Sequence, residues 1–524
     1  MQLKGPGGAV NEGRRPSPEA RAVLAIVLAG LAARLVLSAT IGLGVDESYA
    51  VVVARVFSWS YFDHPPLSFW IAGGLARLTG SENRVLLRLP FMLLFAGTTW
   101  LVFRLTARLY GERAGMFAAL LLNLAPVFSL STGSWVLPDG PLDCAMAGAA
   151  LALTHAVLDP PSEGAWRWWV AAGIASGLAM LSKYHGAFLL LGTTAFVLTR
   201  REARGWLARP QPYVATLIAL ALFSPALFWN AAHGFASFRF QGGRAVPEGG
   251  NAVTALLQNL GGQAGYLLPW IWVPLVVQMY RAARTGPRDA PRWLLLCLGA
   301  GPVLVFTLVS LSGNPGLPHW EAPGYLLLLP LVGDAAARWE ARGASQRAQL
   351  HRWLAAAAIV FVALAAVAAS DVATGWVARA EPQWFTRGDP SLEAYDWSGL
   401  RSQLAARGLL EDSGQVVAAT HWIEAAKIGY AMGPRYPVLC LSGDPRHFFY
   451  ADRPSRFLGR DALLLVRVPP KGMTVDIVKE YAPYFASITP EGTVPVERGG
   501  RTAFQVAVFR AVDMQAAYPS PLPP

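Results

Sequence analysis

The sequence predicts a mostly α-helical membrane protein, a polytopic transmembrane helical bundle of about 11 spans followed by a soluble α/β domain. Of its 524 residues, 54% are hydrophobic and only 15% are charged, whereas soluble domains carry about 25% charged residues. Apolar runs of membrane-spanning character recur up to residue 370 and then stop. The mean hydropathy of +0.36 and the three cysteines exclude a water-soluble multidomain enzyme, a disordered chain and a disulfide scaffold.

Residues 1–20 contain glycine, proline and basic residues, and we expect them to form a disordered cytoplasmic arm. The first predicted span is Val23–Gly44. A secretory signal peptide is the alternative for this stretch, because basic residues precede it. The apolar run is longer than the roughly 7 to 15 residues of a signal peptide and no small-residue cleavage site follows it, which favours a retained span.

Ten further spans are predicted within residues 21–370, which we expect to form the transmembrane domain. Several are shorter than the roughly 20 residues that a spanning helix requires, so a total of ten or thirteen spans stays open. The segments are 85–107, 113–131, 139–158, 166–182, 186–199, 213–231, 264–280, 293–312, 322–335 and 353–370.

The placement of charge tests this topology independently. With the N-terminus in the cytoplasm, the inside loops carry 20 basic residues and the outside face carries seven. Because cytoplasmic loops are enriched in lysine and arginine, this orientation is favoured. The net charge of +11 is therefore a signal of topology and does not indicate nucleic-acid binding. An odd number of spans places residues 371–524 outside.

Residues 371–524 differ from the rest of the chain because their 16 acidic residues balance their 16 basic residues. Short β-rich stretches alternate there with helical stretches, which predicts a soluble α/β domain. The predicted strands are 415–420, 437–442, 461–468 and 502–509, and the predicted helices are 398–410 and 421–432.

The first outside loop, residues 44–84, begins with an acidic pair, Asp46 and Glu47, followed by Tyr49. Apolar residues then recur at helical spacing, which predicts an amphipathic helix on the membrane surface. Its apolar positions are Val51, Val52, Val56 and Phe57, and its expected interfacial anchors are Trp59, Tyr61, Phe62, Phe69 and Trp70. The alternative for the acidic pair is helix capping, because carboxylates favour a helix N-terminus.

Other polar residues occur at the outside ends of the predicted spans. Asp139 and Asp143 lie one helical turn apart, so we expect both to face a cavity, and Lys183 interrupts two apolar runs. His319 and Glu321 follow a later span. Ionisable residues at membrane depth are costly and tend to mark function. Each also has a structural alternative, as a helix cap, a snorkelling anchor or an interfacial aromatic group.

These residue types suit one kind of chemistry. An outward-facing carboxylate can act as a general base toward a hydroxyl group, and lysine or arginine can bind a lipid phosphate. A carboxylate pair can hold a divalent metal ion. The sequence contains neither the phosphate-binding loop nor the dinucleotide fingerprint of nucleotide-binding proteins. The absence of a nucleotide site is consistent with a sugar donor that is activated by another enzyme and delivered on a lipid.

Three motifs resemble the polyprenyl-phosphate-dependent glycosyltransferases of the GT-C superfamily. They are Asp46-Glu47-x-Tyr49, Asp63-His64-Pro65-Pro66-Leu67 and Pro138-Asp139-Gly140-Pro141. The resemblance covers roughly residues 20–335, and its specific part is the first 190 residues. It is to the group that contains the lipid A aminoarabinose transferase and the protein O-mannosyltransferases. It implies a multi-pass protein of the bacterial inner membrane. Together with the charge placement, this predicts a cytoplasmic N-terminus and a periplasmic C-terminal domain.

By this resemblance, Asp46 is the catalytic base of an inverting transfer and Glu47 shapes the acceptor site. Asp139 matches an acidic position associated with a metal ion or the donor phosphate, and Asp143 is a weaker metal candidate. His64 occupies a position where the aminoarabinose transferase pattern has lysine, so Lys183 is expected to take over the phosphate. The remaining candidates for binding the donor are Tyr49, Arg88, His319 and Glu321.

The implied donor is a sugar linked to polyprenyl phosphate, and the implied acceptor is a glycolipid such as lipid A, a polysaccharide or a protein. Two other functions stay open. A secondary transporter would account for the spans, although such proteins concentrate ionisable residues near the middle of the membrane. A non-catalytic membrane protein with a periplasmic binding domain would account for residues 371–524 but would leave the polar cluster without a role.

Overall fold

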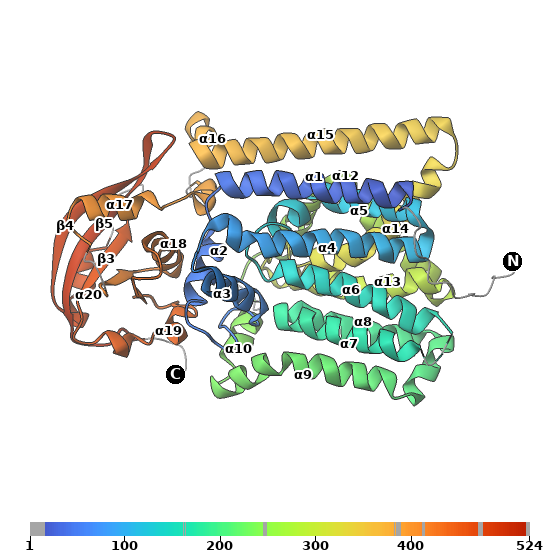
Figure 1. Ribbon diagram of the computed structural model, residues 1–524, viewed down its shortest axis with the longest axis horizontal. Coiled ribbons are helices and arrows are strands. Elements are labelled where there is room, and N and C mark those ends of the chain that lie inside the picture. The colour runs from blue at the N-terminus through green and yellow to red at the C-terminus, as the bar shows by residue number, and fades with distance from the viewer. Residues whose placement is uncertain are drawn as a thin grey trace.

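The computed structural model describes residues 16–160, 162, 164–244, 249–381, 383, 389–410, 414–469 and 475–519. A bundle of long helices runs up to α15, and a domain containing a β-sheet packs against one end of that bundle (Figure 1). The predicted N-terminal arm lies largely outside the described residues. Helix α1 begins at Pro18, where Ser17 Oγ caps it by accepting the N–H of Ala20.

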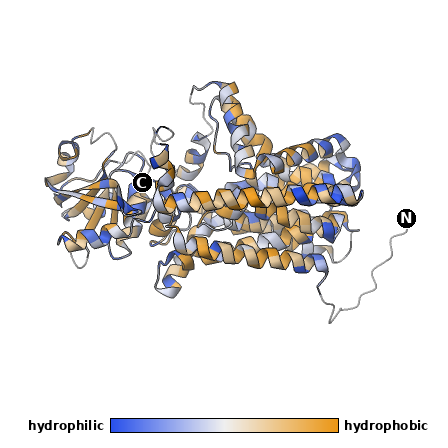
Figure 2. Cartoon of the chain, turned by 90° about the horizontal axis from the view of Figure 1, so that it is seen from above, coloured by the Kyte–Doolittle hydropathy of each residue, from blue (hydrophilic) through white to orange (hydrophobic). Residues whose placement is uncertain are grey.

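The bundle helices are mainly hydrophobic along their length (Figure 2). Among the described residues, six helices are long and apolar enough to cross a membrane, or seven if one bent pair counts as a single span. The chain is therefore a multi-pass membrane protein, as predicted, while the number of 11 spans stays a prediction. The longer helices of the bundle, including those that fall short of the criteria for a membrane span, are α1 (Pro18–Thr40), α4 (Arg84–Tyr110), α5 (Glu112–Leu124), α6 (Asp139–Leu158), α7 (Ala165–Ser182), α8 (Ala187–Thr199), α9 (Gln211–Ala232), α11 (Ala252–Leu267), α12 (Pro269–Thr285), α13 (Ala290–Val309), α14 (Ala322–Glu340) and α15 (Ala344–Thr374).

Two predicted spans are interrupted in the structure. Helices α11 and α12 meet at an angle of 111°, because Leu268 has a positive φ of 69° and Pro269 starts the second helix. The prediction of one continuous span over 264–280 is therefore wrong. The predicted span 113–131 also divides, since α5 ends at Leu124 and a π-helical turn, η1 (Val127–Thr132), follows Pro126.

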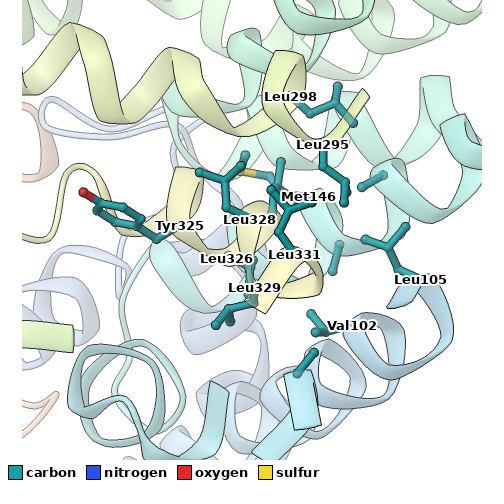
Figure 3. Close-up of a cluster of buried hydrophobic side chains, with 14 of the residues drawn as sticks. Val102, Leu105, Met146, Leu295, Leu298, Tyr325, Leu326, Leu328, Leu329 and Leu331 are labelled. Carbon is teal, nitrogen blue, oxygen red and sulfur yellow. The ribbon is translucent and has the colours of Figure 1, made fainter. Parts of the chain in front are cut away.

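Helix α14 is the centre of the bundle. Every residue from Ala322 to Asp334 is buried, and its leucines pack against α4, α6 and α13 (Figure 3). Lipid tails are as apolar as leucine, so close packing of the helices stabilises such a bundle more than exclusion of water does. Gly333 shows how close the packing is, because a Cβ there would lie 2.4 Å from the carbonyl oxygen of Ala114 in α5.

The C-terminal domain contains a five-stranded sheet in the order β2-β1-β3-β5-β4, which confirms that a small sheet domain follows the bundle. Strand β1 pairs in parallel with β2 and β3, whereas β5 is antiparallel to β3 and β4. Strand β4 was not predicted, because Pro490, Gly492 and Pro495 interrupt its pattern. The strands are β1 (Val416–Ala419), β2 (Val438–Cys440), β3 (Ala462–Arg467), β4 (Phe485–Arg498) and β5 (Arg501–Met514), and the main helices are α17 (Gly399–Ala406) and α18 (Trp422–Met432).

The first loop carries two helices, α2 (Val45–Val53) and α3 (Leu67–Thr79), and it joins the bundle to the sheet domain. Helix α2 packs on α18, and a Cβ added to Gly429 of α18 would lie 3.1 Å from Val52. The prediction that the apolar face of this helix lies on the membrane surface is therefore wrong for Val51 and Val52, which are buried, whereas Val56 and Phe57 follow α2 and are exposed. An apolar helical face has the same sequence pattern whether it meets lipid or protein.

The aromatic residues of the first loop divide in the same way. Tyr61, Phe62 and Phe69 are buried, so they are packing residues and not the predicted interfacial anchors. Trp59 is exposed, with 61% of its surface accessible, and is still available to anchor the loop.

Candidate active site

A cavity of about 720 Å³ lies where the bundle, the first loop and the C-terminal domain meet. Each of the three parts contributes charged or polar side chains to its wall. The bundle and its connecting loops contribute Asp139, Lys183, Arg244 and His319; the first loop contributes Asp46, Tyr49, Asp63 and His64; the C-terminal domain contributes Glu393, Trp422 and Arg446.

Asp46 projects from the first turn of α2 into this cavity. Its side chain is accessible to water inside the cavity although protein surrounds it. Within the described residues its carboxylate has no hydrogen-bond or ion-pair partner. Burial and, next, the negative charge of Asp63 raise the pKa of Asp46 to about 6. An unpaired carboxylate with this pKa can accept a proton near neutral pH.

Glu47, the next residue, has a different environment. It is fully buried, and Arg88 donates to its two oxygens at 2.7 and 2.5 Å. The same carboxylate accepts the backbone N–H groups of Gly44 at 2.8 Å and Val136 at 3.0 Å. Glu47 also borders the cavity, but all four of these contacts are internal, so it fixes the start of α2 against the loop before α6.

Arg88 is not among the residues that line the cavity. Besides Glu47, its guanidinium binds the carbonyl oxygens of Ile41 at 3.0 Å and Gly42 at 2.7 Å. The prediction that Arg88 contacts the donor phosphate therefore does not fit this geometry, because its hydrogen-bonding groups are engaged inside the protein.

Asp139 and Lys183 form a buried ion pair, with Nζ 2.8 Å from Oδ1, on the bundle side of the cavity. Asp143 lies one turn further along α6 and accepts a hydrogen bond from Thr132 at 2.9 Å. Asp143 does not line the cavity. The expectation that both aspartates face it is wrong, because one helical turn moves the second carboxylate below the cavity floor.

The arrangement does not fit a resident metal ion at Asp139. Its carboxylate already binds the Lys183 ammonium, and Asp143 is turned toward Thr132. Within the described part of the chain, no group of three or more histidine, cysteine, aspartate or glutamate side chains is placed to hold a metal. The divalent ion stays an untested prediction, and no step below depends on it.

His64 and His319 both line the cavity. Burial, followed by the positive charge of Lys183, lowers the pKa of His64 to about 3 and that of His319 to about 4. Both imidazoles are therefore neutral at physiological pH. His64 cannot replace the lysine of the aminoarabinose transferase pattern as a cation, although a neutral imidazole can still donate one hydrogen bond.

Glu321 faces a polar cluster beside the cavity and is not part of its wall. Its Oε1 accepts a hydrogen bond from Asn259 at 2.9 Å. The prediction that Glu321 contacts the donor is therefore not supported by its position. Tyr49 does line the cavity, and its hydroxyl donates to Asp63 Oδ1 and accepts the N–H of His447 at 2.9 Å.

Sequence reasoning missed four charged residues of the wall, namely Asp63, Arg244, Glu393 and Arg446. Arg446 of the C-terminal domain binds Asp63 at 2.9 Å across 383 positions in the sequence, and no sequence pattern connects the two. Asp63 begins the motif Asp63-His64-Pro65-Pro66-Leu67, and this motif could have identified it as a site residue. Arg244 follows helix α10 (Ala236–Gly243) and belongs to the few basic residues that the sequence predicts on the outside face. Within the described residues its guanidinium has no carboxylate partner and lies 4.9 Å from the centre of the Trp320 ring.

Comparisons with known proteins agree with this geometry. The model of the dolichyl-phosphate-mannose-protein mannosyltransferase family matches residues 63–229. The lipid A galacturonosyltransferase RgtD of Rhizobium johnstonii is 27% identical over 284 residues, which make up 54% of this chain and 58% of that protein. The chain thus spans little more than half the length of this curated relative.

The fold is similar to that of ArnT from Cupriavidus metallidurans. The structure of ArnT bound to undecaprenyl phosphate matches with a TM-score of 0.63 at 17% identity, covering 93% of this chain and 97% of ArnT. The apo structure of ArnT matches with a TM-score of 0.60 and the same coverage. These comparisons agree with the resemblance drawn from the sequence, both in the fold and in the family model that matches residues 63–229.

Proposed function

We propose that this chain is a GT-C glycosyltransferase that moves a sugar from a polyprenyl-phosphate donor to an acceptor at the periplasmic face of the bacterial inner membrane, with Asp46 as the catalytic base. The observation that carries the proposal is the contrast within the acidic pair. Glu47 is internally satisfied by Arg88 and backbone N–H groups, whereas Asp46 is unpaired and faces the cavity.

The chemistry follows from the residues of the wall. Asp46 accepts the proton of the acceptor hydroxyl, whose oxygen forms a bond with the anomeric carbon of the sugar. The bond from that carbon to the phosphate oxygen breaks, and its electron pair leaves with the polyprenyl phosphate. Attack from the face opposite the leaving group inverts the anomeric centre. A phosphate leaving group needs no strong acid, so one carboxylate is sufficient, in contrast to glycosidases.

Arg244 and Lys183 are the groups best placed to bind the leaving phosphate. Arg244 has no carboxylate partner among the described residues, and Lys183 has three N–H donors, of which Asp139 uses one. Charge-assisted hydrogen bonds from such groups stabilise the negative charge that develops as the bond breaks. His64 and His319, both neutral, can contribute one hydrogen bond each. Trp135 and Trp320 also line the cavity and offer aromatic faces to the sugar ring.

The relatives guide the choice of substrates. ArnT has been solved with undecaprenyl phosphate, and RgtD is a lipid A galacturonosyltransferase. We therefore expect an undecaprenyl-phosphate sugar as the donor, with lipid A as the first acceptor to test, ahead of a polysaccharide or a protein. A transfer at the periplasmic face corresponds to the predicted orientation, with a cytoplasmic N-terminus and a periplasmic C-terminal domain.

The test is a transfer assay with purified protein in lipid nanodiscs. A panel of undecaprenyl-phosphate sugars is supplied with lipid A, and mass spectrometry follows the glycosylated product and the released undecaprenyl phosphate. We expect product with the native protein and with Asp452→Asn, a control outside the cavity, but not with Asp46→Asn. Unchanged turnover in a normally folded Asp46→Asn protein would falsify the base assignment.

A second measurement identifies the substrates in cells. Loss of the gene should cause one polyprenyl-phosphate sugar to accumulate and one decoration of the cell envelope to disappear, both visible by mass spectrometry of extracted lipids. Sugar flux through reconstituted liposomes without transfer would instead support the transporter.

A further inference from the structure

The turn after strand β2 carries a residue of the C-terminal domain into the proposed active site. Arg446 lies in this turn and has a positive φ of 51°. Residues other than glycine rarely adopt this conformation, and it persists where surrounding contacts hold it. Arg446 also lines the cavity that contains Asp46.

Several contacts hold the Arg446 side chain. Its Nη1 donates to Asp63 Oδ2 at 2.9 Å and its Nε to Asp444 Oδ2 at 3.0 Å. The guanidinium carbon lies 4.4 Å from the ring centre of Trp422 and 4.6 Å from that of Phe240. Cations over aromatic faces are attracted to the ring electrons, so the planar group is held by both charge and stacking.

The other contacts around Asp63 complete the arrangement. Tyr49 donates to Asp63 Oδ1, so Tyr49 and Arg446 engage the two carboxylate oxygens separately. The Tyr49 hydroxyl accepts the N–H of His447, and His447 Nδ1 accepts the N–H of Phe62 at 3.1 Å. The turn of the C-terminal domain and the first loop are thus joined on both sides of Asp63.

We propose that Arg446 is a positioning residue of the active site, supplied by the C-terminal domain, which neutralises and holds Asp63 so that Asp46 can ionise beside it. The inference rests on the proposed function, in which Asp46 is the base. It gives the C-terminal domain a part in the reaction, beyond that of a binding module attached to the bundle.

The charges around Asp46 explain why this pairing matters. Tyr49 lies on the same helix, and the charged groups that face Asp46 from other elements are Asp63, Arg446, Glu393 in η7 (Pro390–Ala394) and Arg244. Asp63 and Glu393 raise the pKa of Asp46, whereas Arg446 and Arg244 lower it. Without Arg446, two carboxylates would face Asp46 with only Arg244 opposing them.

Other contacts attach the domain without touching the cavity. Lys427 donates to the carbonyl oxygen of Leu43 at 2.6 Å, and Arg55 donates to that of Gly429 at 3.0 Å. Neither Lys427 nor Arg55 lines the cavity. The variant Arg55→Met therefore removes an interdomain contact of the same residue type and is the matched structural control.

The test is an infrared titration of Asp46 in the full-length protein. The carboxyl band of Asp46 is identified as the native spectrum minus that of Asp46→Asn, and its midpoint is followed against pH. In Arg446→Met we expect the midpoint to rise by about one pH unit, because an unpaired Asp63 disfavours a second negative charge. The double variant Asp63→Asn with Arg446→Met removes both charges and should restore the midpoint.

An unchanged midpoint in folded Arg446→Met, or a rise of the same size in Arg55→Met, would overturn the inference. If Arg446→Met does not fold, Asp63→Asn alone decides, because loss of that negative charge must lower the midpoint if Asp63 acts on Asp46. The titration needs no substrate. A shifted midpoint in a protein that transfers no sugar would therefore uphold the role of Arg446 while refuting the proposed function.

Discussion

Glu47 and Arg88 form a bidentate ion pair inside the protein, with N···O distances of 2.7 and 2.5 Å, at the edge of the cavity into which Asp46 projects. Both partners are buried, with exposed fractions of 0% and 1%. The pair connects helix α4 to the start of α2. Two adjacent carboxylates in the sequence thus have separate tasks, one in structure and one in the proposed chemistry.

The first prediction concerns stability. Arg88→Met should destabilise the protein by about 3–5 kcal/mol, because it leaves the Glu47 carboxylate buried without its cation. The double variant Glu47→Gln with Arg88→Met should recover part of this loss. Thermal unfolding in detergent measures both, and additive losses in the double variant would contradict the assignment.

The second prediction concerns catalysis. Asp46→Asn should reduce kcat by about 10²- to 10⁴-fold, the usual contribution of a general base, while the unfolding temperature stays near that of the native protein. Turnover of undecaprenyl-phosphate sugar measures the first and thermal unfolding the second. A loss of activity that parallels a loss of folded protein would point to a structural role.

The third prediction concerns pH. Because the pKa of Asp46 is raised to about 6, its base form is lost as the pH falls below that value. We expect kcat/KM to be level above about pH 7 and to fall about tenfold per pH unit below pH 6. His64 and His319, with pKa values of about 3 and 4, do not titrate in this pH range and so add no further change to the pH profile of kcat/KM. A flat profile between pH 5 and 7 would exclude Asp46 as the titrating base.

The fourth prediction concerns donor binding. Arg244→Gln removes the cation that has no carboxylate partner among the described residues, so the KM for the lipid donor should rise about 10- to 100-fold, as expected for a charged hydrogen bond worth about 1.5–3 kcal/mol. Arg239→Gln is the matched control, since Arg239 lies in α10, the helix that Arg244 follows, is exposed and does not line the cavity. Equal effects of the two variants would show general electrostatic attraction and no specific phosphate contact.

The fifth prediction concerns the joint between the domains. A Cβ at Gly429 would lie 2.8 Å from Val438 and 3.1 Å from Val52, so Gly429→Ala should cost about 1–3 kcal/mol through overpacking. It should also lower turnover by displacing α18 from α2. Gly399→Ala is the control, because a Cβ there has no heavy atom within 4 Å. Thermal unfolding and the transfer assay applied to both variants check the expectation.

The sequence predicted most of the bundle helices correctly because the hydrophobicity of each apolar run is enough to predict a helix there. A backbone in lipid must satisfy its hydrogen bonds internally, so a run such as 139–158 has no alternative to a helix. The break at Leu268 escaped prediction, since a positive φ at a leucine arises from the surrounding packing. Strand β4 escaped because its prolines and glycine are tolerated only at the edge of the sheet, where β4 lies.

The candidate site was only partly predictable. Asp46, Asp139 and Lys183 were named from local motifs, and all three line the cavity. Arg88, Asp143 and Glu321 were named on the same grounds and do not line it. A motif identifies a residue type at a position, but the direction of its side chain depends on partners from other elements, such as Thr132 for Asp143.

The sequence by itself determined the apolar helices and the acidic residues near their ends, because these properties are local and follow from the solvent that each segment meets. Only the tertiary structure decided which charges are paired. The contact between Asp63 and Arg446 joins positions 383 residues apart, and its existence depends on how the sheet domain packs against the first loop. Electrostatic interactions act through space, so the ionisation of Asp46 is a property of the assembled cavity.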